Sequence, residues 1–121
     1  MTRLNQPQRE ALIELLCLAA ATNHRSSPAE EAAMHRALQK LGWEESRLPR
    51  QYFLLHALQE ARDIVDDEKC VVAFIAAKTG LFATPAERKT ALELIMLVLE
   101  IDGMDEQEDT FLARVTAALE D

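Results

Sequence analysis

The sequence has few residues that break regular structure and few that carry common chemistry. Only three glycines and four prolines occur in 121 residues, which argues against the many turns of an all-β fold. The glycines stand singly, so no glycine-rich phosphate loop is present. Three histidines and two cysteines show no spacing typical of a catalytic nucleophile, a zinc site or a redox motif. These absences favour a helical protein and argue against nucleophilic, zinc or phosphate-loop chemistry.

Hydrophobic stretches are also short. The mostly apolar run of residues 11–21 contains Glu14, lacks a small-residue cleavage site and is about half the ~20 residues needed to cross a bilayer. We therefore expect a cytoplasmic protein without a transmembrane segment. Cys17 and Cys70 lie in apolar stretches and are expected to be buried, reduced thiols.

Negative charge is concentrated at the C-terminal end of the chain. Residues 1–99 hold 13 acids and 12 bases, whereas residues 100–121 hold 8 acids and one base, Arg114. Nearly all of the formal net charge of −8 therefore belongs to the second segment. Such a surface repels nucleic acid, which needs Lys and Arg facing its phosphates. It suits a cation, a basic protein surface or simple solvation.

Start and stop signals divide the chain into helices. Each proline stands near an expected helix start, and Ser27–Glu30 and Thr84–Glu87 have the pattern of capping boxes. Gly42, Gly80 and Gly103 are expected to form left-handed caps, with the next apolar residue folded back onto the helix. No run alternates as a strand would. We predict one all-α domain over residues 1–121, a bundle of about six helices at residues 6–22, 28–41, 49–62, 67–79, 85–101 and 106–119.

The helix at residues 85–101 is expected to lie at the centre of this bundle. Between residues 91 and 101 its polar positions are Glu93 and Glu100, and a helix this apolar is normally surrounded by others. A shift of 79 residues lays Glu14 on Glu93 and Asn23 on Asp102. This match predicts a weak internal repeat of a helical hairpin.

Carboxylates gather between the last two predicted helices, at Glu100, Asp102, Asp105, Glu106 and Glu108. The last three fall in a first helical turn, where the helix dipole alone favours anions. The first two lie at a helix C-terminus, where negative charge is unfavourable. Clustered oxygen ligands suit a hard cation, although the spacing is not that of an EF-hand. We predict weak binding of Ca²⁺ or Mg²⁺ by these residues, with Asn23 as a further ligand. The alternative is that these acids are solvent-exposed and bind no metal.

The arrangement at Asp102, Gly103, Asp105 and Glu108, which is Asp-Gly-x-Asp-x-x-Glu between two helices, resembles the tellurite-resistance TerB-like domains. The preceding apolar helix and the weaker first copy at residues 23–30 share the resemblance. It implies an all-helical stress-response or membrane-associated accessory domain that is not an enzyme, with metal bound at acidic helix junctions. The acidic charge adds a basic protein surface as an expected partner. The chain departs from the pattern at Asn23, where an uncharged amide replaces the carboxylate.

Two other functions stay open on the sequence alone. A metal-free scaffold for protein–protein interaction would expose an apolar surface. A di-metal carboxylate bundle would need Glu14 and Glu93 to face each other in the core beside a histidine. Such bundles use a Glu-x-x-His spacing of three, whereas the pairs Glu31–His35 and His56–Glu60 have a spacing of four.

Overall fold

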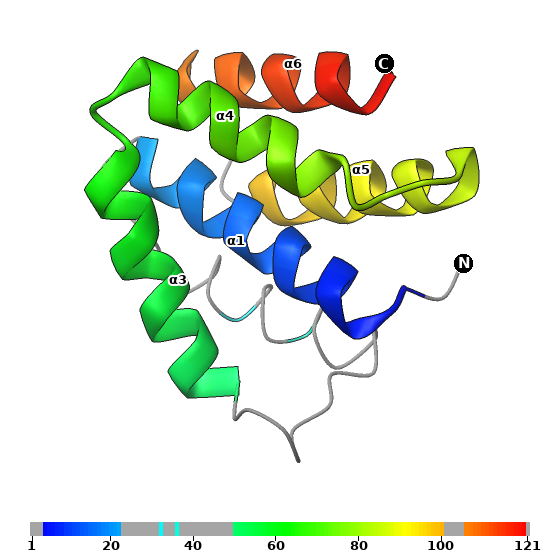
Figure 1. The fold of residues 1–121 in the computed structure, drawn as a ribbon, viewed down its shortest axis with the longest axis horizontal. Coiled ribbons are helices and arrows are strands. Elements are labelled where there is room, and N and C mark those ends of the chain that lie inside the picture. Colours follow the sequence, from blue (N-terminus) through cyan, green and yellow to red (C-terminus); the bar gives the residue numbers. More distant parts are fainter. Residues whose placement is uncertain (1–3, 23–31, 33–35, 37–49, 101–105, 121) are drawn as a thin grey trace.

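The computed structural model describes residues 4–22, 32, 36, 50–100 and 106–120, and all regular structure within them is helical. The helices are α1 (Gln6–Thr22), α3 (Arg50–Ile64), α4 (Glu68–Thr79), α5 (Pro85–Leu99) and α6 (Glu106–Glu120), arranged as a bundle (Figure 1). The all-α prediction is confirmed for this part of the chain. Ala32 and Arg36 are helical, but most of the predicted helix at residues 28–41, and with it the predicted repeat, lies outside the described residues.

Helix α1 is the centre of the bundle. It contacts α3, α4, α5 and α6, and Figure 1 shows it between the other helices. Its large apolar side chains are almost completely buried: Leu12, Ile13, Leu15, Leu16 and Leu18. Small residues such as Ala11 and Ala19 lie among them and are equally buried. Neighbouring helices can therefore pack closely on all sides of α1.

The prediction that the helix at residues 85–101 is surrounded is wrong. Helix α5 packs on α1 and α6 and buries one side, which includes Leu94, Ile95 and Val98. Its opposite side is open, and Leu97 is 55% exposed. Helices α1 and α5 are both largely apolar, so composition alone could not show which of them is central. The central position depends on which neighbouring helices each one contacts.

Of the described helices, α1, α4 and α5 begin with side-chain caps. The predicted capping box at α5 is confirmed, since Glu87 N–H donates to Thr84 Oγ1 at 3.2 Å and Thr84 N–H donates to Glu87 Oε1 at 3.1 Å. Helix α1 has the same reciprocal pair, between Asn5 and Gln8, with both distances 2.9 Å. At α4, Asp67 Oδ1 accepts from two backbone N–H groups of the first turn.

The C-terminal end of α4 differs from the prediction. Gly80 has φ −62° and ψ −17°, in the right-handed helical region, so it is not a left-handed cap. The chain turns once more, and Phe82 N–H donates to a carbonyl of the last turn at 3.1 Å. Phe82 is 0% exposed, whereas Leu81 is 44% exposed. The residue that folds into the core is therefore Phe82. The caps predicted at Gly42 and Gly103 lie outside the described residues.

Hydrogen bonds fix the link between α4 and α5 to the rest of the bundle. Gln8 Nε2, from α1, donates to the carbonyl of Leu81 at 2.9 Å. Arg88 Nε, from α5, donates to the carbonyl of Phe82 at 2.9 Å. Gln8 also hydrogen-bonds the Glu87 side chain, which lowers the pKa of that exposed carboxyl, and the N–H groups of the cap add to the effect. The end of α4 is thus held by both α1 and α5.

Within the described residues, no helix combines the length and apolar character that crossing a bilayer requires.

Candidate functional site

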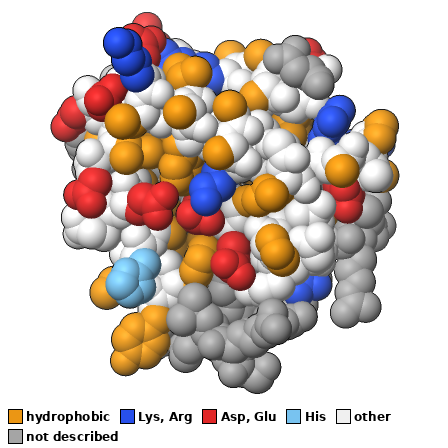
Figure 2. Space-filling view, viewed as in Figure 1, with side chains coloured by type: hydrophobic (Ala, Val, Ile, Leu, Met, Phe, Trp, Pro, Cys, Tyr) orange, Lys and Arg blue, Asp and Glu red, His pale blue; other side chains and the backbone are white. Residues whose placement is uncertain are grey.

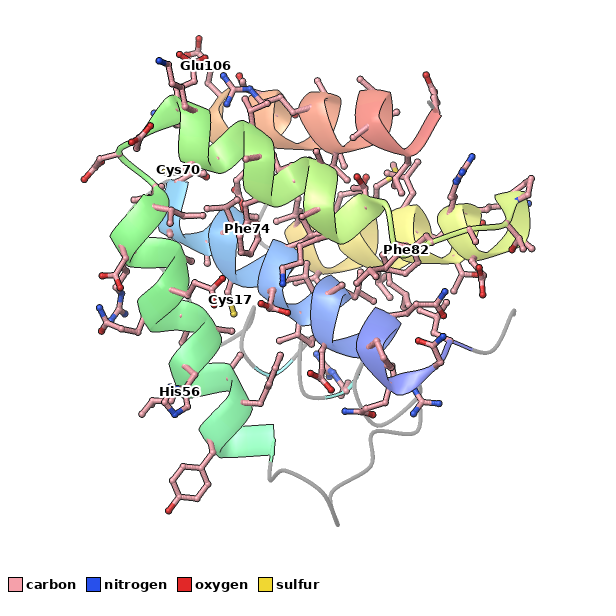
Figure 3. All side chains as sticks on the ribbon, viewed as in Figure 1. Cys17, His56, Cys70, Phe74, Phe82 and Glu106 are labelled. Carbon is pink, nitrogen blue, oxygen red and sulfur yellow. The ribbon has the colours of Figure 1, made fainter. Side chains whose placement is uncertain are left out.

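Three of the predicted cation ligands lie in the described part of the chain. Glu100 is the C-cap of α5 and is exposed. Glu106, the first residue of α6, is exposed as well (Figure 3). Glu108 is two positions further on, about 200° around the helix, and is only 1% exposed. The remaining predicted ligands, Asp102, Asp105 and Asn23, lie outside the described residues, so their role stays a prediction.

A pocket of about 380 Å³ lies beside Glu106. Its lining comes from the end of α1 and the starts of α4 and α6: Thr22, Val71, Glu106, Gln107, Thr110, Phe111 and Arg114. Thr22 directly precedes Asn23 in the chain, and Glu106 directly follows Asp105. Both segments predicted to supply ligands are therefore attached to residues at the same pocket.

A second acidic run, Asp66-Asp67-Glu68, lies at the start of α4, which also contributes to the pocket. Glu68 Oε1 is 3.0 Å from Arg114 Nη2 of α6, so the start of α4 is tied to α6 beside the pocket. These three acids were not among the ligands predicted from the sequence. The visible signal was three consecutive carboxylates at the start of the helix predicted at residues 67–79. Their proximity to α6 could only come from the fold.

The pocket combines apolar lining with a few oxygen donors of the kind that suit a hard cation. Glu106 offers a carboxylate, Gln107 an amide oxygen, and Thr22 and Thr110 hydroxyls. Among the described lining residues, Arg114 is cationic, and its charge is offset by Glu68. Among residues 4–22, 50–100 and 106–120, no three His, Cys, Asp or Glu side chains are grouped as metal ligands. A complete set there would need carboxylates from the segments that adjoin Thr22 and Glu106.

The outward side of α4 forms an apolar surface that we call the α4 face: Cys70, Val72, Ala73, Ala76, Ala77 and Gly80. All six residues are exposed, and Figure 2 shows hydrophobic side chains where α4 crosses the front of the molecule. The buried residues of α4 are Val71, Ile75 and Thr79. The prediction that Cys70 is buried is wrong, because Cys70 lies on the outward side (Figure 3). Cys17 is buried as predicted, and burial raises the pKa of its thiol to about 12.

An ion pair between α1 and α4 lies in a largely buried position. Glu14 Oε2 is 2.9 Å from Lys78 Nζ, and the two side chains are 13% and 23% exposed. The ammonium group also lies 5.2 Å from the centre of the Phe74 ring. Burial raises the pKa of Glu14, Lys78 opposes this, and the nearby charges of Glu60 and Glu10 raise it further. The ion pair therefore joins α1 to α4, although burial and the neighbouring acids disfavour the charged form of Glu14.

The arrangement that a di-metal centre would need is not formed. Glu14 pairs with Lys78, whereas Glu93 is exposed and lies 4.0 Å from Lys89 on its own helix. The two glutamates therefore do not face each other in the core. His56, the histidine within the described residues, is exposed on α3 (Figure 3).

Comparison with known proteins adds no relative. No protein-family model, no curated protein and no solved structure matches this chain. The resemblance to TerB-like domains therefore stays a hypothesis based on the residues named above.

Proposed function

We propose that the protein is a non-enzymatic accessory domain, similar to TerB-like domains, that binds a divalent cation at the pocket between α1, α4 and α6. The observation that carries this proposal is that Thr22 and Glu106 line one pocket. Each adjoins a segment that the sequence predicted to carry ligands, with Asn23 on one side and Asp102 and Asp105 on the other. A role in the stress response follows from the resemblance and belongs to the same proposal.

The chemistry of the pocket supports Ca²⁺ or Mg²⁺ over softer metals. Among the residues that the structure describes, its lining side chains present oxygen donors and include no histidine or cysteine, and such donors suit hard cations. Glu106 is the described carboxylate best placed to bind, because it is exposed and lines the pocket. Glu108 is a weaker candidate than the sequence suggested, because it belongs to the buried side of α6.

Calcium is expected to raise the melting temperature by a few degrees, since a ligand at ten times its Kd adds about 1.4 kcal/mol to the free energy of unfolding. In NMR titrations the amide shifts should centre on Thr22, Glu106 and Thr110. Replacing both Asp102 and Asp105 with asparagine should abolish the melting shift and leave helical content unchanged.

The matched control replaces two exposed acids away from the pocket, Glu93→Gln with Glu120→Gln, and should retain the calcium response. A calcium response that survives the Asp102→Asn, Asp105→Asn change, or amide shifts that centre away from α6, would rule out a cation site at this pocket.

A scaffold for protein–protein interaction is the second candidate function, and the α4 face favours it. Contiguous exposed apolar surface on a small domain marks binding sites for other proteins. The α4 face includes no residue that lines the cation pocket. One protein can therefore carry both functions on separate surfaces.

A further inference from the structure

Helix α4 is apolar on nearly all sides but is covered on one side only. Its buried residues are Val71, Ile75 and Thr79. A helix that is apolar all round is normally enclosed by its neighbours. The described helices α1, α3 and α6 contact α4, yet they leave the whole α4 face exposed. Leu81 is exposed just beyond the end of α4 and extends this apolar surface.

The shape of the α4 face suits another helix. Ala73, Ala77 and Gly80 follow one another at helical spacing along its length. Their short side chains let a second backbone approach to the ~8–10 Å that separates packed helices. Val72 adds a larger apolar side chain that is more than half exposed. A helix lying along α4 could therefore bury a continuous apolar stripe of its own.

Acidic residues lie near α4 in two groups: Glu14 of α1 with Glu10 and Glu60 close to it, and Asp66, Asp67 and Glu68 at the N-terminal end of α4. Glu14 is bound to Lys78 of α4, and both Glu10 and Glu60 are close enough to act on its charge. Lys78 and Arg114 are each paired with one of these acids. Lys69 is exposed on the same side of α4 as Ala73 and Ala76 and is the base at the N-terminal end of that side. Figure 2 shows acidic side chains beside and below the apolar ones over α4.

We propose that the α4 face is the docking site for a basic amphipathic helix of a partner protein. The apolar stripe of that helix would pack along Ala73, Ala77 and Gly80, and its Lys and Arg residues would meet the bordering acids. A second copy of this chain fits less well, because the net charge is −8 and the same acids would face each other. An anionic lipid surface is disfavoured for the same reason.

The test uses the full chain and a synthetic helix of about 18 residues, with Leu and Ala at positions i, i+3, i+4 and i+7 and Lys elsewhere. Its binding should shift the NMR amide signals of Ala73, Ala77 and Gly80. A peptide with Glu in place of every Lys should not bind. Replacing Glu60 with glutamine should weaken binding about threefold and reduce its dependence on salt.

Ala77→Arg places a bulky cation at the centre of the face and should weaken binding of the Lys peptide by about tenfold or more. Arginine is a good helix former at an exposed position, so an unchanged unfolding midpoint will show that the fold is intact. Ala86→Arg is the matched control, since Ala86 is exposed in the first turn of α5, and it should leave binding unchanged.

The inference rests on the proposed role as a protein–protein interaction scaffold. The two peptides distinguish a basic partner from a partner that binds through apolar contacts alone. Equal binding of the Lys and Glu peptides would overturn the basic partner while leaving an apolar docking surface. If Ala77→Arg leaves the affinity for the Lys peptide unchanged, or if neither peptide binds, the proposal and the interaction function are both overturned. A dimer of the chain, or binding to phosphatidylcholine and phosphatidylglycerol vesicles, that Ala77→Arg abolishes would overturn the proposal by assigning the face to another occupant. The calcium titration tests the cation site independently.

Discussion

Replacing Phe82 with alanine is expected to lower the free energy of unfolding by about 3–5 kcal/mol, the usual range for truncating a fully buried phenylalanine. Phe82 is completely buried although it lies outside any helix, and Figure 3 shows it between the end of α4 and α5. The loss combines the transfer of the ring out of the core with the cavity left behind. Since small domains have a total stability of only about 5–15 kcal/mol, urea unfolding should show a large drop in midpoint.

Leu81→Ala is the control for that change. Leu81 is adjacent in the chain but substantially exposed, and its backbone carbonyl keeps the hydrogen bond from Gln8 in the variant. We expect a loss below about 1 kcal/mol, because little apolar area leaves contact with the core. If the two variants lost the same stability, the assignment of Phe82 as the core residue of this link would be wrong.

The two neighbouring residues also show how far sequence patterns predict this fold. A glycine followed by an apolar residue predicted a left-handed cap with Leu81 packed inward. Leu81 and Phe82 are both apolar, so either could satisfy the hydrophobic contact. The core accepts Phe82, and Gly80 therefore stays in the right-handed region. By contrast, the capping box of Thr84 and Glu87 was predictable because both partners lie within one turn.

The same limit applies to the helices as a whole. Helix boundaries depend on local signals, and α1 begins and ends where the sequence predicted. The position of a helix in the bundle depends on distant contacts. Helix α4 is apolar nearly all round, so no periodic pattern indicated which side faces outward. This is why the exposure of Cys70 and the apolar surface around it were not predicted.

At the candidate cation site, the sequence indicated which segment carries the acids but not which way each acidic side chain points. Glu106 and Glu108 occupy the same first turn of α6 and have the same side-chain chemistry. Their spacing places them on opposite sides of the helix, and only the packing of α6 decides that Glu108 faces inward. The proximity of Glu68 to Arg114 likewise joins residues 46 positions apart. Local patterns carry no information about such contacts.

Replacing Lys78 with methionine is expected to destabilise the fold by about 1–3 kcal/mol at neutral pH. This lies below the ~3–5 kcal/mol for breaking a fully buried ion pair, because Glu14 and Lys78 keep some contact with water. Methionine keeps the length of the apolar stem and removes the charge, so Glu14 would stay buried without its partner at 2.9 Å. Urea unfolding measures the loss. Lys89→Met is the control, since Lys89 is 79% exposed and lies 4.0 Å from Glu93, and it should change stability by less than about 0.5 kcal/mol.

The loss should depend on pH in a direction that the pKa of Glu14 sets. In the wild type burial already raises this pKa above its ordinary value of 4.5, so the native state binds the proton more tightly than the unfolded state. The contribution of Glu14 to stability therefore falls as pH rises from about 4.5 through the raised folded pKa. Removing Lys78 takes away the hydrogen bond and charge that lower this pKa, so in the variant the fall should extend to higher pH and be larger in total. The difference between wild type and Lys78→Met should accordingly be small at about pH 4, where Glu14 is protonated in both, and largest near pH 7. An equal loss at both pH values would mean that Lys78 stabilises the fold through its packing on Phe74 and not through Glu14.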